Sequence, residues 1–174
     1  MADTIVEMRR LQDRADETLA GAHEAPADAA PSTLEPPDVF ISFRFGEAPV
    51  EALALKAALE ALQLKVFRSD ISPGGDQQHV IAHALCNCKL AIILATKTYG
   101  RQTNALFCTS AEMNFIVGND RKDYYLVRMI PFGENWTEPG TTMAFPPSIM
   151  FKLWLPGEPM PDDLVDEVAA RLGP

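Results

Sequence analysis

The carboxylate of Glu112 is the strongest candidate for a catalytic group in this chain. It lies in the segment Phe107-Cys-Thr-Ser-Ala-Glu-Met-Asn-Phe115, and no other Asp or Glu occurs between Asp76 and Asp120. Phe115 and Ile116 follow it by three and four residues, so Glu112 shares one face of a predicted helix with apolar side chains. Such a face packs against a sheet, where a carboxylate could stabilise positive charge that develops on a sugar ring.

The same residues also match a purely structural pattern. Thr109-Ser-Ala-Glu112 has the spacing of a capping box, in which Thr109 caps the helix and the Glu112 side chain returns to its backbone. Local sequence leaves the catalytic and the capping interpretations open.

The elements that must position Glu112 alternate between strand and helix from Asp38 onwards. The predicted strands span 39–43, 64–67, 90–94, 124–130 and a short 149–155. The predicted helices span 47–62, 76–85, 109–118 and 161–172, and the proline-rich stretch 131–147 is predicted to be irregular. This alternation predicts an α/β protein with a flavodoxin-like, three-layer fold and a five-stranded parallel sheet in the order 2-1-3-4-5.

Finer features are predicted within these helices. Leu55, Leu59 and Leu62 recur on one face of the 47–62 helix and should face the core. Gly118 should end the 109–118 helix as a C′ glycine.

The strand order itself predicts where a ligand should bind. Ligands of such sheets bind at the carboxyl ends of the strands, where the strand order reverses, which here lies between strands one and three. The residues that follow these two strands are Phe43, Arg44 and Phe45, and Thr96 and Lys97. Arg44 also has a structural interpretation, as a surface arginine whose stem lies on Phe43.

A loop with strong turn chemistry leaves the same edge after strand two. It spans Ser69–Gly75 and brings Asp70 and Ser72 to the predicted site. Pro73, Gly74 and Gly75 permit rearrangement, so these three residues are predicted to gate the site or to form an interface. A plain turn into the next helix is the alternative.

Composition limits the class of protein. The chain has 174 residues, of which 47% are hydrophobic, and a net charge of −9, which disfavours nucleic acid and anionic membranes as partners. Three cysteines fit a reducing cytosol, and no apolar run is long enough to cross a bilayer, so a cytoplasmic protein is expected.

No metal site is expected either. Cys86 and Cys88 are spaced wrongly for a zinc knuckle, and His79 and His83 lie one helical turn apart without an obvious third ligand. The two histidines are therefore predicted to face solvent.

The N-terminal part differs from the rest of the chain. Residues 1–20 carry a thin apolar stripe at helical spacing, formed by Ile5, Met8, Leu11, Ala15 and Leu19. This helical tail could dock on another surface, form a short coiled coil or fray. Residues 21–37 form an Ala- and Pro-rich linker, and residues 38–174 form the domain.

Several common chemistries lack their motifs. The chain has no G-x-x-x-x-G-K-[ST] or G-x-G-x-x-G nucleotide cradle and no G-x-S-x-G nucleophile elbow. A phosphoacceptor receiver domain would need an aspartate at the end of strand three, where this chain has Ala95-Thr96-Lys97.

Four segments in order resemble the Toll/interleukin receptor (TIR) domain family. Asp38-Val-Phe-Ile-Ser-Phe-Arg44 is similar to its first box, and Phe67-Arg-Ser-Asp-Ile-Ser-Pro-Gly-Gly-Asp76 resembles its second box, the BB loop. Lys89-Leu-Ala-Ile-Ile-Leu-Ala-Thr with Tyr99 looks like its strand-C passage, and Phe107-Cys108 with Glu112-Met113 resembles its W-C-x-x-E-L region.

The resemblance implies a hydrolase that cleaves NAD, an NADase acting in innate immunity or cell-death signalling after self-association. In enzymatic members the glutamate of the last region is catalytic, which corresponds to Glu112. Phe43 and Phe45 would then contact a ring, and Arg44 or Lys97 the pyrophosphate. NAD is the expected substrate, with no metal or other cofactor.

A non-enzymatic adaptor is the alternative that the resemblance also allows. Phe107 stands where the family has tryptophan, and Cys108 lies four residues before the acid instead of three. Such an adaptor would act through homotypic TIR–TIR contacts, with the Ser69–Gly75 loop as the interface.

Overall fold

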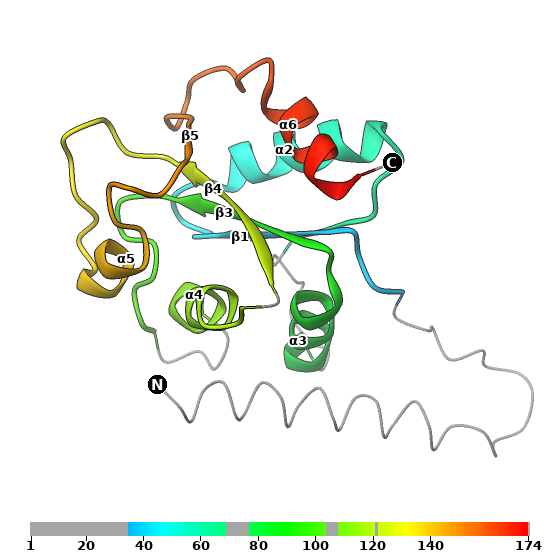
Figure 1. Cartoon of the computed structure of the whole chain (residues 1–174), viewed down its shortest axis with the longest axis horizontal. Helices are drawn as coiled ribbons and strands as arrows, with labels where there is room; N and C mark the ends of the chain where they lie inside the picture. The colour runs from blue at the N-terminus through cyan, green and yellow to red at the C-terminus, as the bar shows by residue number, and fades with distance from the viewer. Residues whose placement is uncertain (1–34, 69–76, 104–107, 121, 174) are drawn as a thin grey trace, which may run out of the picture.

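A parallel five-stranded sheet forms the centre of the molecule. The computed structural model describes residues 35–68, 77–103, 108–120 and 122–173. The sheet order is β2-β1-β3-β4-β5, which confirms the predicted flavodoxin-like fold (Figure 1). The strands are β1 (Val39–Phe43), β2 (Val66–Arg68), β3 (Leu90–Ala95), β4 (Asp123–Arg128) and β5 (Lys152–Leu153).

Helices cover both faces of this sheet. They are α2 (Pro49–Ala61), α3 (Gln77–Asn87), α4 (Thr109–Val117), α5 (Pro139–Ala144) and α6 (Leu164–Leu172). Figure 1 shows α2 and α6 on one face and α3 and α4 on the other. None of the helices in the described ranges combines the length and the apolarity needed to cross a bilayer.

Strand alternation divides the core into two clusters. Val39, Ile41 and Phe43 of β1 pack on the α2 and α6 side, whereas Phe40 packs on the α3 and α4 side. All five residues of β1 are buried, as expected for a strand that is covered on both faces. Ser42 follows Phe40 by two residues and therefore faces α4.

The prediction that 131–147 is irregular is wrong, because this stretch contains α5. The helix has six residues, too few for its apolar pattern to be recognised in the sequence. Pro139 lies in its first turn, where the missing amide hydrogen costs no helical hydrogen bond.

Three residues of other helices also differ from expectation. Leu62 is 48% exposed, because α2 ends at Ala61 and Leu62 is only its C-cap. Gly118 is the C-cap of α4 with φ −81°, so it does not adopt the positive φ of a C′ glycine. His83 is buried instead of facing solvent, because it lies beside the sheet edge with Phe67 and Ala84.

Candidate active site

Glu112 takes part in a buried hydrogen-bond chain between β1, the β3–α4 connection and α4. Ser42 Oγ donates to Glu112 Oε2 at 2.5 Å, and the Tyr99 hydroxyl lies 2.6 Å from the same Ser42 oxygen. Ser42 and Tyr99 have no exposed surface, and Glu112 is 4% exposed. These hydrogen bonds therefore hold the Glu112 carboxylate inside the protein, at the carboxyl edge of the sheet.

The capping-box interpretation of Glu112 is wrong. Helix α4 has Cys108 as its N-cap, without a side-chain hydrogen bond, so the helix begins one residue earlier than the box requires. The Thr109 hydroxyl instead accepts the amide hydrogen of Gly100 at 3.1 Å. The Glu112 carboxylate is thus free to point across the interior towards β1.

The surroundings of Glu112 make its charged form costly. Burial raises the pKa of Glu112 to about 7, although the hydrogen bond from Ser42 acts in the opposite direction. Burial, together with the charge of Glu112, also raises the pKa of Tyr99 well above its usual value. Near neutral pH the carboxyl of Glu112 therefore occurs in both protonation states, while Tyr99 keeps its proton.

A pocket of about 320 Å³ opens next to Glu112. Its lining comes from the end of β1, the segment before α4 and the first turn of α4: Phe43, Arg44, Phe45, Gly46, Thr103, Cys108, Thr109 and Glu112. Four of the predicted site residues, Phe43, Arg44, Phe45 and Glu112, thus lie around one cavity. Its volume falls at the lower end of the range of about 300–1,000 Å³ that is typical of small-molecule sites.

The three residues that follow one another at this rim differ in exposure. Phe45 is 72% exposed and is available to contact a ligand. Phe43 is 4% exposed and belongs to the core on the α2 side, with the Arg68 guanidinium 5.7 Å from its ring centre. Arg44 is half-buried, and its Nε lies 3.3 Å from a carboxylate oxygen of Glu47.

The other predicted site residues lie elsewhere. Lys97 is not part of the pocket lining, and its Nζ lies 2.6 Å from Glu134 Oε2. Asp70, Ser72 and the segment Pro73–Gly75 fall outside the described residues, as does the N-terminal tail. In the described ranges, no group of three or more His, Cys, Asp or Glu side chains could hold a metal ion.

Sequence reasoning missed the partners of Glu112 and of Arg44. Ser42 is the only polar residue in the buried strand Val39–Phe43, and a buried hydroxyl requires a partner, which was the available signal. The sequence indicates Glu47 only as the start of a helix, yet Glu47 accepts hydrogen bonds from the side chain and the backbone amide of Thr98. It therefore connects the loop after β1 to the loop after β3.

The turn that carries Tyr99 depends on Gly100. This glycine has φ +82°, and an added Cβ would overlap the Thr141 hydroxyl, which donates to the Tyr99 carbonyl at 2.6 Å. Gly133 has a similar φ of +85° but open space around it, so it provides a matched control.

We expect Gly100→Ala to lower the free energy of unfolding by about 1–3 kcal/mol more than Gly133→Ala does, because strain is common to both and the overlap is not. Urea denaturation of both variants measures this difference. Equal losses in the two variants would contradict the proposed tight contact.

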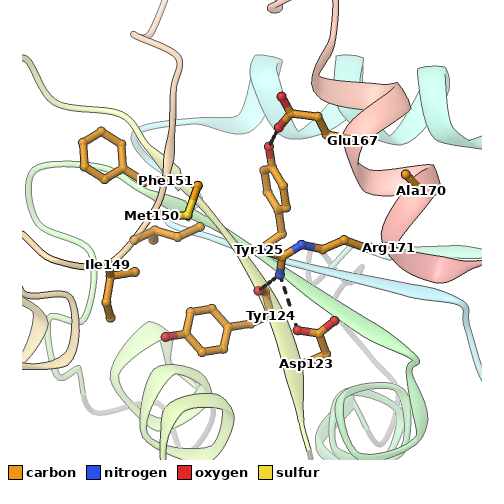
Figure 2. Close-up of a pocket in the computed structure, with 10 residues that line it drawn as sticks. Asp123, Tyr124, Tyr125, Ile149, Met150, Phe151, Glu167, Ala170 and Arg171 are labelled. Atoms are coloured by element: carbon orange, nitrogen blue, oxygen red, sulfur yellow. Dashed lines mark hydrogen bonds and ion pairs between the residues drawn. The ribbon is translucent and has the colours of Figure 1, made fainter.

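A second, larger pocket of about 580 Å³ lies between β4, the segment before β5 and α6. Figure 2 shows that four of its polar side chains are already paired, Tyr125 with Glu167 and Arg171 with Asp123. Tyr125 donates to Glu167, and Arg171 donates to the Tyr124 carbonyl at 2.8 Å and contacts Asp123 at 3.4 Å. No acid with the burial of Glu112 lines this pocket, which makes the pocket beside Glu112 the better candidate for catalysis.

Comparisons with known proteins provide no family assignment. No protein-family model matches the chain, and no curated protein matches it at a significant level. The fold and the site therefore define a flavodoxin-like α/β protein with a buried carboxylate at the carboxyl edge of its sheet.

Proposed function

We propose that this protein is a TIR-type enzyme that hydrolyses or cyclises NAD at the nicotinamide–ribose bond. The observation that carries the proposal is the buried Glu112 carboxylate in a pocket that Arg44 and Phe45 also line. A buried acid with a raised pKa in a pocket is typical of a functional group. The TIR-like boxes of the sequence favour NAD as the substrate and defence or cell-death signalling as the setting.

The chemistry requires little from the protein beyond one carboxylate. When the bond between C1′ of the ribose and the pyridinium nitrogen breaks, both electrons go to the nitrogen, and nicotinamide departs as a neutral molecule. Positive charge then develops on the ribose, and ionised Glu112 stabilises it through its charge and through hydrogen bonds to ribose hydroxyls. Water completes hydrolysis to ADP-ribose with release of one proton, whereas attack by an adenine nitrogen gives a cyclic product.

The raised pKa of Glu112 is compatible with this role. The pyridinium of NAD carries a positive charge, and an opposite charge nearby favours the ionised carboxylate. Substrate binding should therefore lower the pKa of Glu112 and increase the reactive fraction at neutral pH. Ser42 would fix the orientation of the carboxylate through its 2.5 Å hydrogen bond.

Arg44 and Phe45 would bind the rest of the substrate. The exposed ring of Phe45 can pack on a nicotinamide or adenine ring, and Phe43 would contribute only the buried edge of the pocket. Arg44 can pair with the pyrophosphate if it leaves Glu47, a partly exposed partner that binds it weakly. Lys97 would likewise have to leave its partner Glu134 before it could bind the pyrophosphate, and it lies outside the pocket.

Incubating the pure protein with NAD and separating the products by chromatography tests the proposed function. The expected result is release of nicotinamide together with ADP-ribose or a cyclic isomer. Intact NAD after long incubation at high protein concentration would contradict it.

Specific activity is expected to rise with protein concentration, because TIR-type sites tend to be completed by neighbouring copies. The measurement is the initial rate of nicotinamide release over a wide range of enzyme concentrations, with light scattering on the same samples. A rate strictly proportional to enzyme would instead indicate that a single copy is sufficient.

The non-enzymatic adaptor remains the second candidate function. It is favoured by large apolar side chains exposed near the short strand β5, since Phe132 is 72% and Met150 is 90% exposed. Such surfaces often mark sites of protein association. Concentration-dependent assembly without any NAD turnover would support the adaptor.

A further inference from the structure

The outer face of α2 is apolar although it points away from the sheet. Leu55 and Leu59 fill the core from the opposite side of this helix and have no exposed surface. The exposed apolar residues recur at helical spacing: Val50, Leu53, Ala54, Ala57 and Ala61. Within α2, only Glu60 is an exposed charged residue. A helix that is apolar on both sides is normally covered on both sides, so this outer α2 face lacks a partner.

The described chain begins at the edge strand β2, on the side of the sheet that α3 covers, where Glu35 and Pro37 line a small pocket with Val80, His83 and Ala84 of α3. Glu35 is its first residue, and its carboxylate lies 2.5 Å from the Nζ of Lys65. Lys65 follows Ala61, the last residue of α2, by four positions. The 34 residues before Glu35 are therefore joined to the domain beside the β2 edge, and the outer α2 face lies on the far side of that edge.

These N-terminal residues contain the complementary pattern. Ile5, Met8, Leu11, Ala15 and Leu19 lie within 120° of one another on a helical projection at about 100° per residue. The charged residues between them all fall on the other side: Glu7, Arg9, Arg10, Asp13, Arg14, Asp16 and Glu17. A helix over 5–19 would thus have one apolar face, which it could not bury by itself.

We propose that residues 5–19 form an amphipathic helix that packs on the outer α2 face of the same chain. At about 1.5 Å per residue, this helix and the stripe from Val50 to Ala61 are similar in length, about 21 Å and about 17 Å. The segment between residue 19 and Glu35 can extend over about 50 Å, so it can connect the two in either orientation. The alanines of α2 leave room for the larger Ile5, Met8, Leu11 and Leu19 side chains.

The tether favours packing within one chain over packing between two chains. A segment joined by a short flexible linker has an effective concentration on the order of millimolar, far above the protein concentration in a dilute sample. The proposal concerns the N-terminal segment and α2 only, so it does not depend on NAD cleavage by the Glu112 site.

Hydrogen–deuterium exchange of the full chain, followed by mass spectrometry, tests the proposal. An isolated helix of this length is marginal in water, so slow exchange within residues 5–19 would report docking. We expect these amides to exchange at least about tenfold more slowly than unstructured amides, and we expect Leu53→Glu to remove that protection. Met143→Glu, a charge introduced at another exposed apolar position, on α5, should leave the protection unchanged.

A reciprocal variant separates docking from damage to the domain. Leu11→Glu lies outside the described domain and should cause the same loss of protection in residues 5–19, with unchanged exchange in β1 and β3. Fast exchange of residues 5–19 in the unmodified chain would overturn the proposal, as would protection that survives both Leu53→Glu and Leu11→Glu. Protection that disappears on dilution to a monomer, as judged by light scattering, would show that α2 is covered by a second copy instead.

Discussion

Glu112→Gln is expected to lower NAD turnover by about a hundredfold to a thousandfold, the loss that follows removal of one main electrostatic group from an active site. Glutamine keeps the shape of the side chain and can still accept the hydrogen bond from Ser42, but it has no negative charge to offer the ribose. The fold should persist, because no ion pair depends on Glu112 in the described part of the chain. The measurement is nicotinamide release under conditions that saturate the unmodified enzyme.

Glu60→Gln is the matched control for this variant. Glu60 is an exposed carboxylate on α2, and its contact in the described structure is a surface ion pair with Lys56 at 2.9 Å. Its replacement should leave turnover within about twofold, since surface pairs contribute little. If Glu112→Gln melts like the unmodified protein and keeps its full rate, then Glu112 does not catalyse the reaction.

The sequence was sufficient to predict the sheet, because its strands are short apolar runs between clear helical patterns. The fully apolar run over Leu90–Ala95 belongs to the centre of the sheet, as the parallel strand order places it. The position of Glu112 on a face shared with Phe115 and Ile116 followed from helical spacing and is confirmed by the burial of all three. Local periodicity was thus enough for the fold and for one functional candidate.

What could not be predicted depends on contacts between distant segments. The hydrogen bond from Ser42 to Glu112 joins residues separated by 70 positions, and the bond from Ser42 to Tyr99 joins residues separated by 57. Local sequence instead suggested a capping box for Glu112, because Thr109 has the correct spacing. Helix α4 begins one residue earlier than a capping box with Thr109 requires, and this difference excludes the capping role of Glu112. The exact first residue of a helix is the feature that local sequence determines least.

The free energy of unfolding is expected to fall by about 3 kcal/mol as the pH rises from 4.5 to 7, through the titration of Glu112 alone. The pKa of this carboxyl is about 7 in the folded protein and 4.5 without its surroundings. Between these values the folded state binds more protons than the unfolded state, so stability is lost as the pH rises. Above the folded pKa the loss is complete, and the contribution of this group no longer changes.

Comparison with Glu112→Gln isolates this contribution from those of all other groups. Urea denaturation of both proteins at several pH values should show the variant gaining stability relative to the unmodified protein between pH 4.5 and 7, by about 3 kcal/mol in total. Tyr99 does not disturb the comparison, because its pKa lies well above this range. A difference independent of pH would mean that Glu112 is already ionised in the fold at pH 4.5.

The expected loss of stability on ionisation of Glu112 has a functional meaning. A carboxylate that weakens the fold whenever it ionises is a poor structural element, and Gln could make the same hydrogen bond with Ser42 at no such cost. A buried group with this property is expected where the charge itself is needed, because function often accepts a loss of stability. A stability gain in Glu112→Gln at pH 8, combined with loss of turnover, would therefore indicate that the cost of this charge is retained for catalysis.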